Sequence, residues 1–228
     1  GIIPMIEFPL NTPTHIMCDQ ATKNLKRDTK MFTHRGPHAN TALIVGGAPS
    51  LRDTLVKLRY LRDRGGHVFA LNGAHDYLIE RGLVPDFHVI CDAKVDNLVF
   101  VAKPHREVCY LIAAQCHPFV FDALKNFSVV QWVAYVDGIK TVVEASDKPV
   151  LVVGGGGTVM LKTMALCQLS GYRRMHLFGV DSSYHMGYNH AYPQPMNDRE
   201  TKVVVEAGTK TFTCAPRMCK QAEDFEDQ

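Results

Sequence analysis

The chain has 228 residues, of which 46% are hydrophobic and 21% are charged, as is ordinary for a folded globular protein. Its 25 Lys and Arg against 23 Asp and Glu leave a net charge of +2, which gives no electrostatic case for a nucleic-acid-binding or membrane-surface protein. No stretch approaches the roughly 18 consecutive apolar residues of a membrane helix. We therefore expect a cytoplasmic protein without a membrane segment.

The seven cysteines contain no Cys-x-x-Cys pair. An odd number of cysteines without metal-ligand spacing indicates reduced thiols in a cytosol-like compartment, and it argues against both a disulfide framework and a zinc site.

The first part of the chain differs in pattern from the rest. Residues 1–40 are interrupted by prolines and then become polar and basic, and we interpret them as an N-terminal arm with one short helix. We interpret residues 41–228 as a single nucleotide-binding α/β domain. In it, short apolar runs that predict strands alternate with helical patterns. The strands are expected at 41–47, 67–71, 86–92, 107–114, 127–133, 148–154 and 173–181, and the helices at 50–66, 73–82, 118–126 and 157–172.

This alternation favours a mostly parallel sheet with helices on both faces, because strands buried on both faces are continuously apolar. The expected fold is a doubly wound, Rossmann-like α/β domain. Residues 201–214 predict a terminal hairpin, and residues 216–228 predict a helix.

Ligands of such sheets bind beyond the carboxyl ends of the strands. Five of the predicted strand ends carry small or polar residues: Gly46-Gly47-Ala48-Pro49-Ser50, Asn72-Gly73, Asp92, Gly154 to Thr158, and Asp181-Ser182-Ser183-Tyr184. We therefore expect a ligand site at this edge of the sheet.

The turn at 46–50 joins a strand directly to a helix. Glycines let the backbone approach a ligand, and Pro49 suits the first helical position. Free N–H groups and the helix dipole then favour an anion such as phosphate, although a simple strand–helix turn remains an alternative. The turn matches neither a Walker A loop nor the G-x-G-x-x-G fingerprint.

A second glycine run, Gly154 to Gly157, precedes the helix at 157–172. Gly155, Gly156 and Gly157 are expected to bind a second phosphate, with a hydroxyl contact from Thr158; close helix–sheet packing is the alternative. Two phosphate-sized sites suit a nucleotide diphosphate or a nucleotide-activated donor.

Two carboxylates follow strands and are candidates for holding Mg²⁺. Asp92 and Asp181 would bind the metal together in a Mg²⁺-dependent enzyme, with several water ligands retained. Alternatively, Asp92 hydrogen-bonds a ribose. No covalently bound cofactor is expected.

Residues 182–198 show no apolar period and contain several tyrosines, prolines and histidines. A loop of this length is usually functional, and we expect a lid over the site. His190 is the candidate general base, because a loop histidine titrates near neutral pH. Tyr184 is expected to stabilise the leaving group, and Asp181 is the third catalytic candidate. Ser182 and Ser183 are expected to contact the nucleotide.

Three segments, "VGGAPSL", "ALNGAHDYLIERGLVPDFHVICD" and "GGTVMLKTMALCQLSGYRRMHLFGVDSSY", resemble in order and spacing the DUF115 family, also called MAF/flag10 or hydroxymethylpterin-diphosphokinase-like. The resemblance covers about Thr41 to Tyr184. The segment "HAYPQPMN" looks like the form found in phage and prophage members.

The resemblance implies a sialyltransferase-like core and one of two activities. One branch of the family is thought to transfer nonulosonic acids to flagellin, and the other is an archaeal enzyme that moves diphosphate from ATP to a hydroxymethyl-dihydropterin with Mg²⁺. By position, the turn at 46–50, Asn72 and the "GGGGT" run correspond to the nucleotide-binding elements. The loop that holds His190 does not align well enough to carry a role over.

Three functions follow as hypotheses. The first is a glycosyltransferase that uses a nucleotide-activated sugar of the CMP type. The second is a Mg²⁺-dependent diphosphokinase acting on a hydroxymethylpterin-like substrate, and the third is a nucleotide-binding module without catalysis. The sequence names no acceptor, and it leaves a homo-oligomer open.

Overall fold

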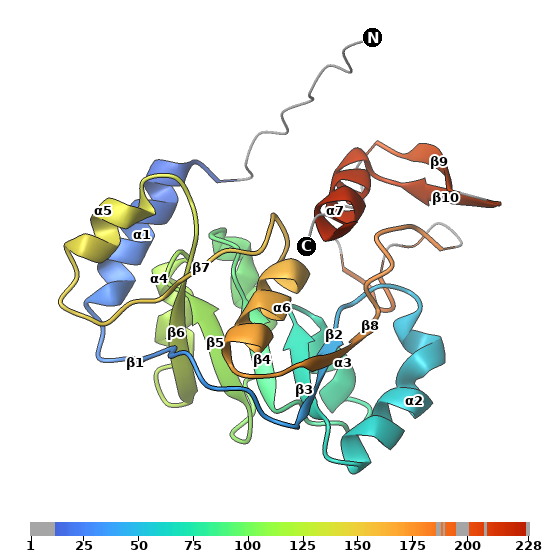
Figure 1. Cartoon of the computed structure of the whole chain (residues 1–228), viewed down its shortest axis with the longest axis horizontal. Coiled ribbons are helices and arrows are strands. Elements are labelled where there is room, and N and C mark those ends of the chain that lie inside the picture. The colour runs from blue at the N-terminus through green and yellow to red at the C-terminus, as the bar shows by residue number, and fades with distance from the viewer. Residues whose placement is uncertain (1–11, 186–187, 189, 195–200, 208, 227–228) are drawn as a thin grey trace, which may run out of the picture.

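The computed structural model describes residues 12–185, 188, 190–194, 201–207 and 209–226. Its centre is an eight-stranded sheet in the order β1-β6-β5-β4-β3-β2-β8, with β7 paired to β6 beside this path (Figure 1). All recorded pairs of this sheet are parallel, so the predicted mostly parallel α/β fold is confirmed. The strands are β1 Lys30–Met31, β2 Thr41–Val45, β3 His67–Leu71, β4 Phe87–Ile90, β5 Cys109–Ala113, β6 Ser128–Ala134, β7 Val152–Val153 and β8 Arg174–Phe178.

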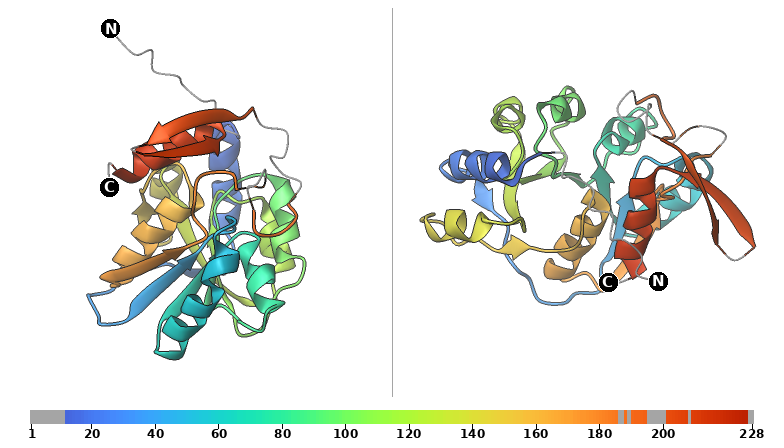
Figure 2. Two further views of the ribbon diagram at one scale, coloured as in Figure 1. Left: turned by 90° about the vertical axis from the view of Figure 1, so that its right-hand side faces the viewer. Right: turned by 90° about the horizontal axis from the view of Figure 1, so that it is seen from above.

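Helices flank the sheet on both faces, as the right-hand view of Figure 2 shows. One face is covered by α2 Leu51–Asp63, α3 Ala74–Ile79, the 3₁₀ helix η1 Val95–Val101 and α4 Pro118–Ala123, and the other face by α6 Val159–Leu169. Helix α1, Thr14–Leu25, packs against α4 and against α5, Ile139–Glu144, beside the β6 end of the sheet.

The central strands are buried because they are apolar on both faces. In β2 and β3, four consecutive residues are buried, and the largest core cluster includes Phe69, Tyr110 and Trp132. Burying such side chains contributes roughly 1.5–3 kcal/mol each, so the sheet is a rigid platform for whatever lies at its edges.

The order of the strands reverses at β2. From β2 the chain runs outward through β3, β4 and β5 to β6, and it then returns to place β8 on the other side of β2. In open α/β sheets this reversal is where ligands bind, at the carboxyl ends of the strands.

The C-terminal residues form a small unit above that edge (Figures 1 and 2). Strands β9, Val203–Ala207, and β10, Lys210–Cys214, make an antiparallel hairpin, and α7, Pro216–Glu226, follows. The hairpin and the helix were both predicted. A bridge between Tyr184 and Thr213 joins the hairpin to the segment after β8.

Three features differ from the sequence expectations. Residues within the interpreted arm form β1, and Lys30 pairs with Val130 at the edge of the sheet. Helices η1 and α5 were not predicted. Of the strand expected at 148–154, only Val152–Val153 is extended in a ladder, because β7 pairs only with the end of β6.

Among the described residues, no helix combines the length and apolarity needed to span a membrane.

Candidate functional site

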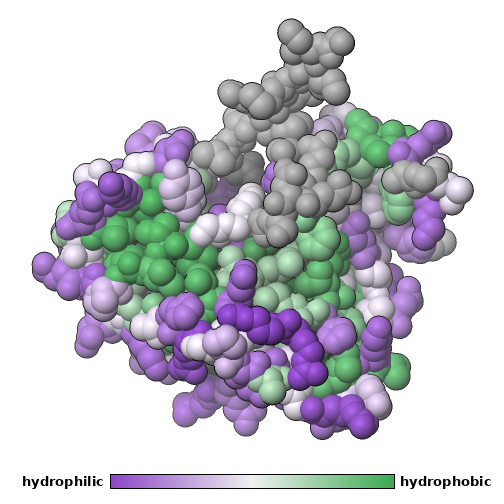
Figure 3. Space-filling view, viewed as in Figure 1, coloured by the Kyte–Doolittle hydropathy of each residue, from purple (hydrophilic) through white to green (hydrophobic). Residues whose placement is uncertain are grey.

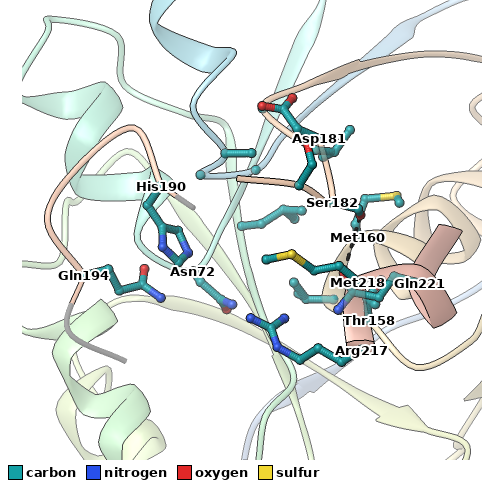
Figure 4. A pocket seen from close by; sticks show the side chains of 18 of the residues that line it. Asn72, Thr158, Met160, Asp181, Ser182, His190, Gln194, Arg217, Met218 and Gln221 are labelled. Carbon is teal, nitrogen blue, oxygen red and sulfur yellow. Dashed lines mark hydrogen bonds between the residues drawn. The ribbon is translucent and has the colours of Figure 1, made fainter. Parts of the chain in front are cut away.

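A pocket of ≈ 190 Å³ lies at the carboxyl edge where the strand order reverses. Its walls come from the ends of β2, β3 and β8, the first turn of α6, the segment around His190, and α7 (Figure 4). The residues predicted for the site that line it are Gly46, Gly47, Ala48, Asn72, Thr158, Asp181, Ser182, Ser183 and His190.

Three amides of the turn after β2, which were expected to bind a ligand, are bonded to other parts of the protein. The N–H groups of Gly46 and Ala48 donate to the carbonyls of Phe178 and Gly179, each at 2.8 Å. The N–H of Ser50 donates to Asp181 Oδ2 at 2.9 Å, and the hydroxyl of Ser50 donates to Oδ1 of the same carboxylate. Asp181 therefore supplies the anion that the N-terminus of α2 favours.

The glycines of this turn make room for protein. A Cβ on Gly47 would lie 2.1 Å from the hydroxyl of Tyr192, and one on Gly73, in the neighbouring turn after β3, would lie 2.8 Å from its ring. The N–H of Ala191 donates to the Gly47 carbonyl at 2.7 Å, and Arg52 Nε donates to the Ala191 carbonyl at 2.8 Å. The described residues around Tyr192 are therefore docked on the turn, and burial raises the pKa of the Tyr192 phenol above its usual range, with Asp76 adding to the rise.

Asn72 directly follows β3 and has a positive φ of 47°, which few residues other than glycine adopt. Its carbonyl accepts a hydrogen bond from Nε2 of the buried His88 at 2.8 Å. Its side-chain Oδ1 is buried and has no hydrogen-bond partner among the described residues. An unsatisfied buried acceptor at a strained residue indicates a place for a ligand donor.

The second glycine run behaves differently from the first. Gly155 and Gly156 have positive φ angles of 104° and 73°, and Thr158 Oγ1 caps α6 by accepting from the N–H of Leu161 at 3.1 Å. Thr158, Val159 and Met160 line the pocket. Because the first N–H groups of a helix have no intrahelical acceptor, this turn can donate to an anion in the pocket.

The glycines of this run do not themselves line the pocket. A Cβ on Gly155 would lie 3.0 Å from both Ala165 and the Leu161 carbonyl, so close packing against α6 explains this glycine. A Cβ on Gly157 would face Asp224 of α7 at 3.6 Å. The loop thus positions α6 and leaves room for α7.

Helix α7 contributes residues that the sequence analysis missed. Arg217, Met218 and Gln221 line the pocket, and Arg217 extends toward Asn72 and Thr158 in Figure 4. Ser182 Oγ donates to Gln221 Oε1 at 3.5 Å across the pocket. The basic residue and the amphipathic pattern of residues 216–226 were visible in the sequence, but nothing local placed them at the sheet edge.

Among the catalytic candidates, His190 lies in the pocket, with its ring 5.7 Å from that of Tyr192. Tyr184 is not a lining residue: its ring packs with the hairpin and α7 in a cluster that includes Cys214 and Met218. The ammonium of Lys202 lies 4.5 Å from the centre of that ring. Part of the expected lid, residues 186–187, 189 and 195–198, lies outside the described residues.

Asp92 and Asp181 do not come together as the metal hypothesis required. Asp92 is not among the pocket residues, and its Oδ1 accepts from the N–H of Lys94 at 3.0 Å. Both oxygens of Asp181 are engaged by Ser50. Within the part of the chain that the structure describes, no cluster of three or more His, Cys, Asp or Glu could hold a metal ion. Pro49, Ser50 and Gly73 also lie outside the pocket lining.

Comparisons with known proteins agree with this architecture. The family model described as 6-hydroxymethylpterin diphosphokinase MptE-like matches residues 16–187. A MAf glycosyltransferase from Magnetospirillum magneticum AMB-1 has a similar structure, with a TM-score of 0.72 and 19% sequence identity. The similarity covers 95% of this chain and 34% of that protein, so this chain spans about a third of its length. No curated protein matches the sequence.

Proposed function

The chain belongs to the 6-hydroxymethylpterin diphosphokinase MptE-like family, and on that premise we propose that it is a nucleotide-dependent transferase. The proposed reaction is glycosyl transfer from a nucleotide-activated sugar of the CMP type. The likeness to a MAf glycosyltransferase supports the fold that such a reaction needs. The observation that carries the proposal is the pocket at the strand reversal, in which the first turn of α6, Asn72 and Arg217 converge.

Each of these groups has a part in holding a nucleotide phosphate. The first turn of α6 offers N–H groups and the positive end of its dipole. Arg217 offers a planar guanidinium, which pairs well with phosphate oxygens. The unsatisfied Oδ1 of Asn72 accepts a hydrogen bond from a ribose hydroxyl or a base amino group.

The volume of the pocket limits the size of the ligand that it can enclose. At ≈ 190 Å³ it is smaller than the roughly 300–1,000 Å³ of sites that enclose a whole drug-sized ligand. It therefore encloses a phosphate with part of a nucleoside, and the rest of the donor extends beyond it.

In this proposal His190 takes the proton of the acceptor hydroxyl as the glycosyl bond forms. The nucleotide phosphate leaves with the electron pair of the broken bond, and the α6 turn and Arg217 stabilise its charge. Positioned general bases contribute typically about 10²–10⁴-fold to rate. His190→Ala should then lower kcat by about this factor with nearly unchanged nucleotide affinity. Lost affinity with retained kcat would instead make His190 a binding residue.

The diphosphokinase alternative takes its support from the description of the family. Its Mg²⁺ was expected between Asp92 and Asp181, and the pocket contains only the second of these. The third hypothesis is a binding module without catalysis. Unlike the other two, it predicts that a bound nucleotide or nucleotide sugar is not converted to product.

A thermal-shift panel of CMP, CDP, UDP, GDP, AMP and ATP, with and without Mg²⁺, tests the proposal. A ligand at a hundredfold excess over its Kd stabilises the folded state by about 2.7 kcal/mol. Stabilisation by CMP without metal supports the glycosyltransferase, and stabilisation by ATP only with Mg²⁺ supports the diphosphokinase. If no nucleotide raises the melting temperature, the proposal is wrong.

A further inference from the structure

A second cavity lies at the opposite, amino-terminal edge of the sheet. Its volume is ≈ 380 Å³, twice that of the pocket at the carboxyl edge. It lies under the segment 32–40, here called the strap, which crosses from β1 to β2 in front of the sheet (Figure 1). Because it lies at the other ends of the strands, this cavity belongs to no part of the site already described.

The floor of the cavity is a row of side chains on adjacent strands. Phe69 pairs in register with Phe87, and Phe87 pairs with Cys109. Leu111 and Val130 form the next pair on the same face, since residues two apart on a strand share a face. The rings of Phe69 and Phe87 are stacked, with centroids 4.5 Å apart. Because the two rings face each other, they turn their edges to the cavity, and ring edges suit the face of a planar ligand ring.

The strap is fixed at both ends, so the cavity is built into the fold. The N–H of Phe32 donates to the Gln131 carbonyl at 2.8 Å, and the N–H of His38 donates to the Gly171 carbonyl at 3.0 Å. Gly171 lets the strap come close, because a Cβ on it would lie 2.2 Å from the Gly36 carbonyl oxygen. The cavity is therefore present without any movement of the strap.

One wall carries polar groups around Tyr172. The Tyr172 hydroxyl and Nδ1 of His67 are hydrogen-bonded at 2.6 Å, and the His38 ring meets the Tyr172 ring edge to face at 4.5 Å. His38 Nε2 donates to the Ser170 carbonyl at 3.0 Å. In neutral His38 this leaves Nδ1 as an acceptor, and that atom is buried without a partner among the described residues.

The cavity also has cationic side chains at its mouth. Lys30 and Arg35 line it and are exposed, and Figure 3 shows hydrophilic surface where the strap crosses the lower part of this face. The one carboxylate in the lining, that of Asp86, accepts from the N–H of Val68 at 2.7 Å. Burial raises the pKa of the Cys109 thiol, and the charge of Lys30 acts against that rise. Burial likewise raises the pKa of Tyr172 to about 12, and the charge of Arg35 acts against it.

From this arrangement we infer that the cavity under the strap is a second ligand site, which binds a small aromatic acid. The ring lies on the floor formed by Phe69 and Phe87, and the anionic group meets Lys30 and Arg35. A hydrogen-bond donor on the ring has an acceptor in His38 Nδ1. The volume lies within the range of about 300–1,000 Å³ found for sites that enclose small molecules.

Isothermal titration calorimetry with three probes of one ring system tests the inference. The probes are 1-naphthoate, 1-naphthyl phosphate and uncharged 1-naphthalenemethanol. We expect at least one acid to bind at least tenfold more tightly than the alcohol, and the tighter acid identifies carboxylate or phosphate as the preferred group. No binding by either acid, or equal binding by the acids and the alcohol, overturns the inference.

Variants locate the binding. The double variant Lys30→Gln with Arg35→Gln should weaken binding of the tighter acid at least tenfold, whereas Lys57→Gln, which removes an exposed cation of α2, should not change it. Arg217→Ala, at the other edge, should also leave it unchanged. Cys109→Phe should abolish binding by filling the floor, with the melting temperature as a check on folding. If the acid still binds the double variant as tightly as it binds the wild type, the site lies elsewhere.

Discussion

The two glycine-rich turns of this chain have similar sequences and different uses. Both lead from a strand into a helix at the carboxyl edge of the sheet, one at residues 46–50 and the other at 154–158. At the first turn, the carbonyls of Phe178 and Gly179 accept from the amides of Gly46 and Ala48, and Asp181 caps the helix. At the second, a threonine caps the helix and its first turn faces the pocket. Whether a helix N-terminus is available to a ligand thus depends on a neighbouring loop that is distant in sequence.

Removing the carboxylate at the first turn should have the largest effect on stability. Asp181→Ala should destabilise the fold by about 2–3 kcal/mol, since hydrogen bonds to a charged group and its interaction with a helix terminus are both lost. Urea unfolding measures the change. The matched control is Asp63→Ala at the opposite end of α2, where a carboxylate gains nothing from the helix dipole. Equal effects of the two variants would show that Asp181 does not cap α2.

Adding a methyl group to the first turn tests whether it makes room for protein or for phosphate. Gly47→Ala should destabilise the fold by about 1–3 kcal/mol, the usual cost of overpacking, because the new Cβ meets Tyr192. The loss should shrink in a Tyr192→Ala background, which a double-mutant cycle measures. An unchanged fold with abolished nucleotide binding would restore the phosphate interpretation of this turn.

Asn72 lies in the pocket between the two turns and should affect binding more than folding. Asn72→Ala should weaken nucleotide binding by about 1–3 kcal/mol, because a buried partner on the ligand is left unpaired. Asn72→Gly is the matched variant, since it removes the same amide but tolerates the positive φ. Calorimetry should give similar losses of affinity for both. An unaltered Kd would show that Asn72 serves the turn after β3 and takes no part in nucleotide binding.

The cap of the second turn should have the smallest effect. Thr158→Ala should cost about 1 kcal/mol of stability, the typical value for loss of an N-cap. Thr158→Ser, which retains the hydroxyl, should recover most of it in the same unfolding experiment. If both variants are as stable as the wild type, the hydroxyl does not hold this turn in place.

The sequence predicted the sheet well because its strands are continuously apolar. Runs such as that of β2 have no polar face that could lie against solvent, so both faces of the strand must be buried. The alternation with helices then implies parallel pairing. The prediction was weaker where pairing is short. Strand β1 has two residues and β7 has two, and neither has a pattern that separates it from a loop.

The meeting of the candidate residues could be predicted better than their contacts. Asn72, Thr158, Asp181 and His190 do meet at one pocket, since parallel strands end at a common edge. The role of Asp181 could not be read from the sequence, because it depends on a contact with Ser50 across 131 residues. Arg217 was missed for the same reason: the path of the chain after β8 brings α7 over the edge.

The central claim is that the nucleotide phosphate meets the first turn of α6 and not the turn after β2. Amide ¹H–¹⁵N spectra, recorded while the chain is titrated with CMP or with whichever nucleotide stabilises it most, test this directly. The account predicts that the Val159 and Met160 amides shift most, while those of Ala48 and Ser50, which are bonded to Gly179 and Asp181, stay in place. Large shifts at Ala48 and Ser50 with none at Val159 and Met160 would contradict it.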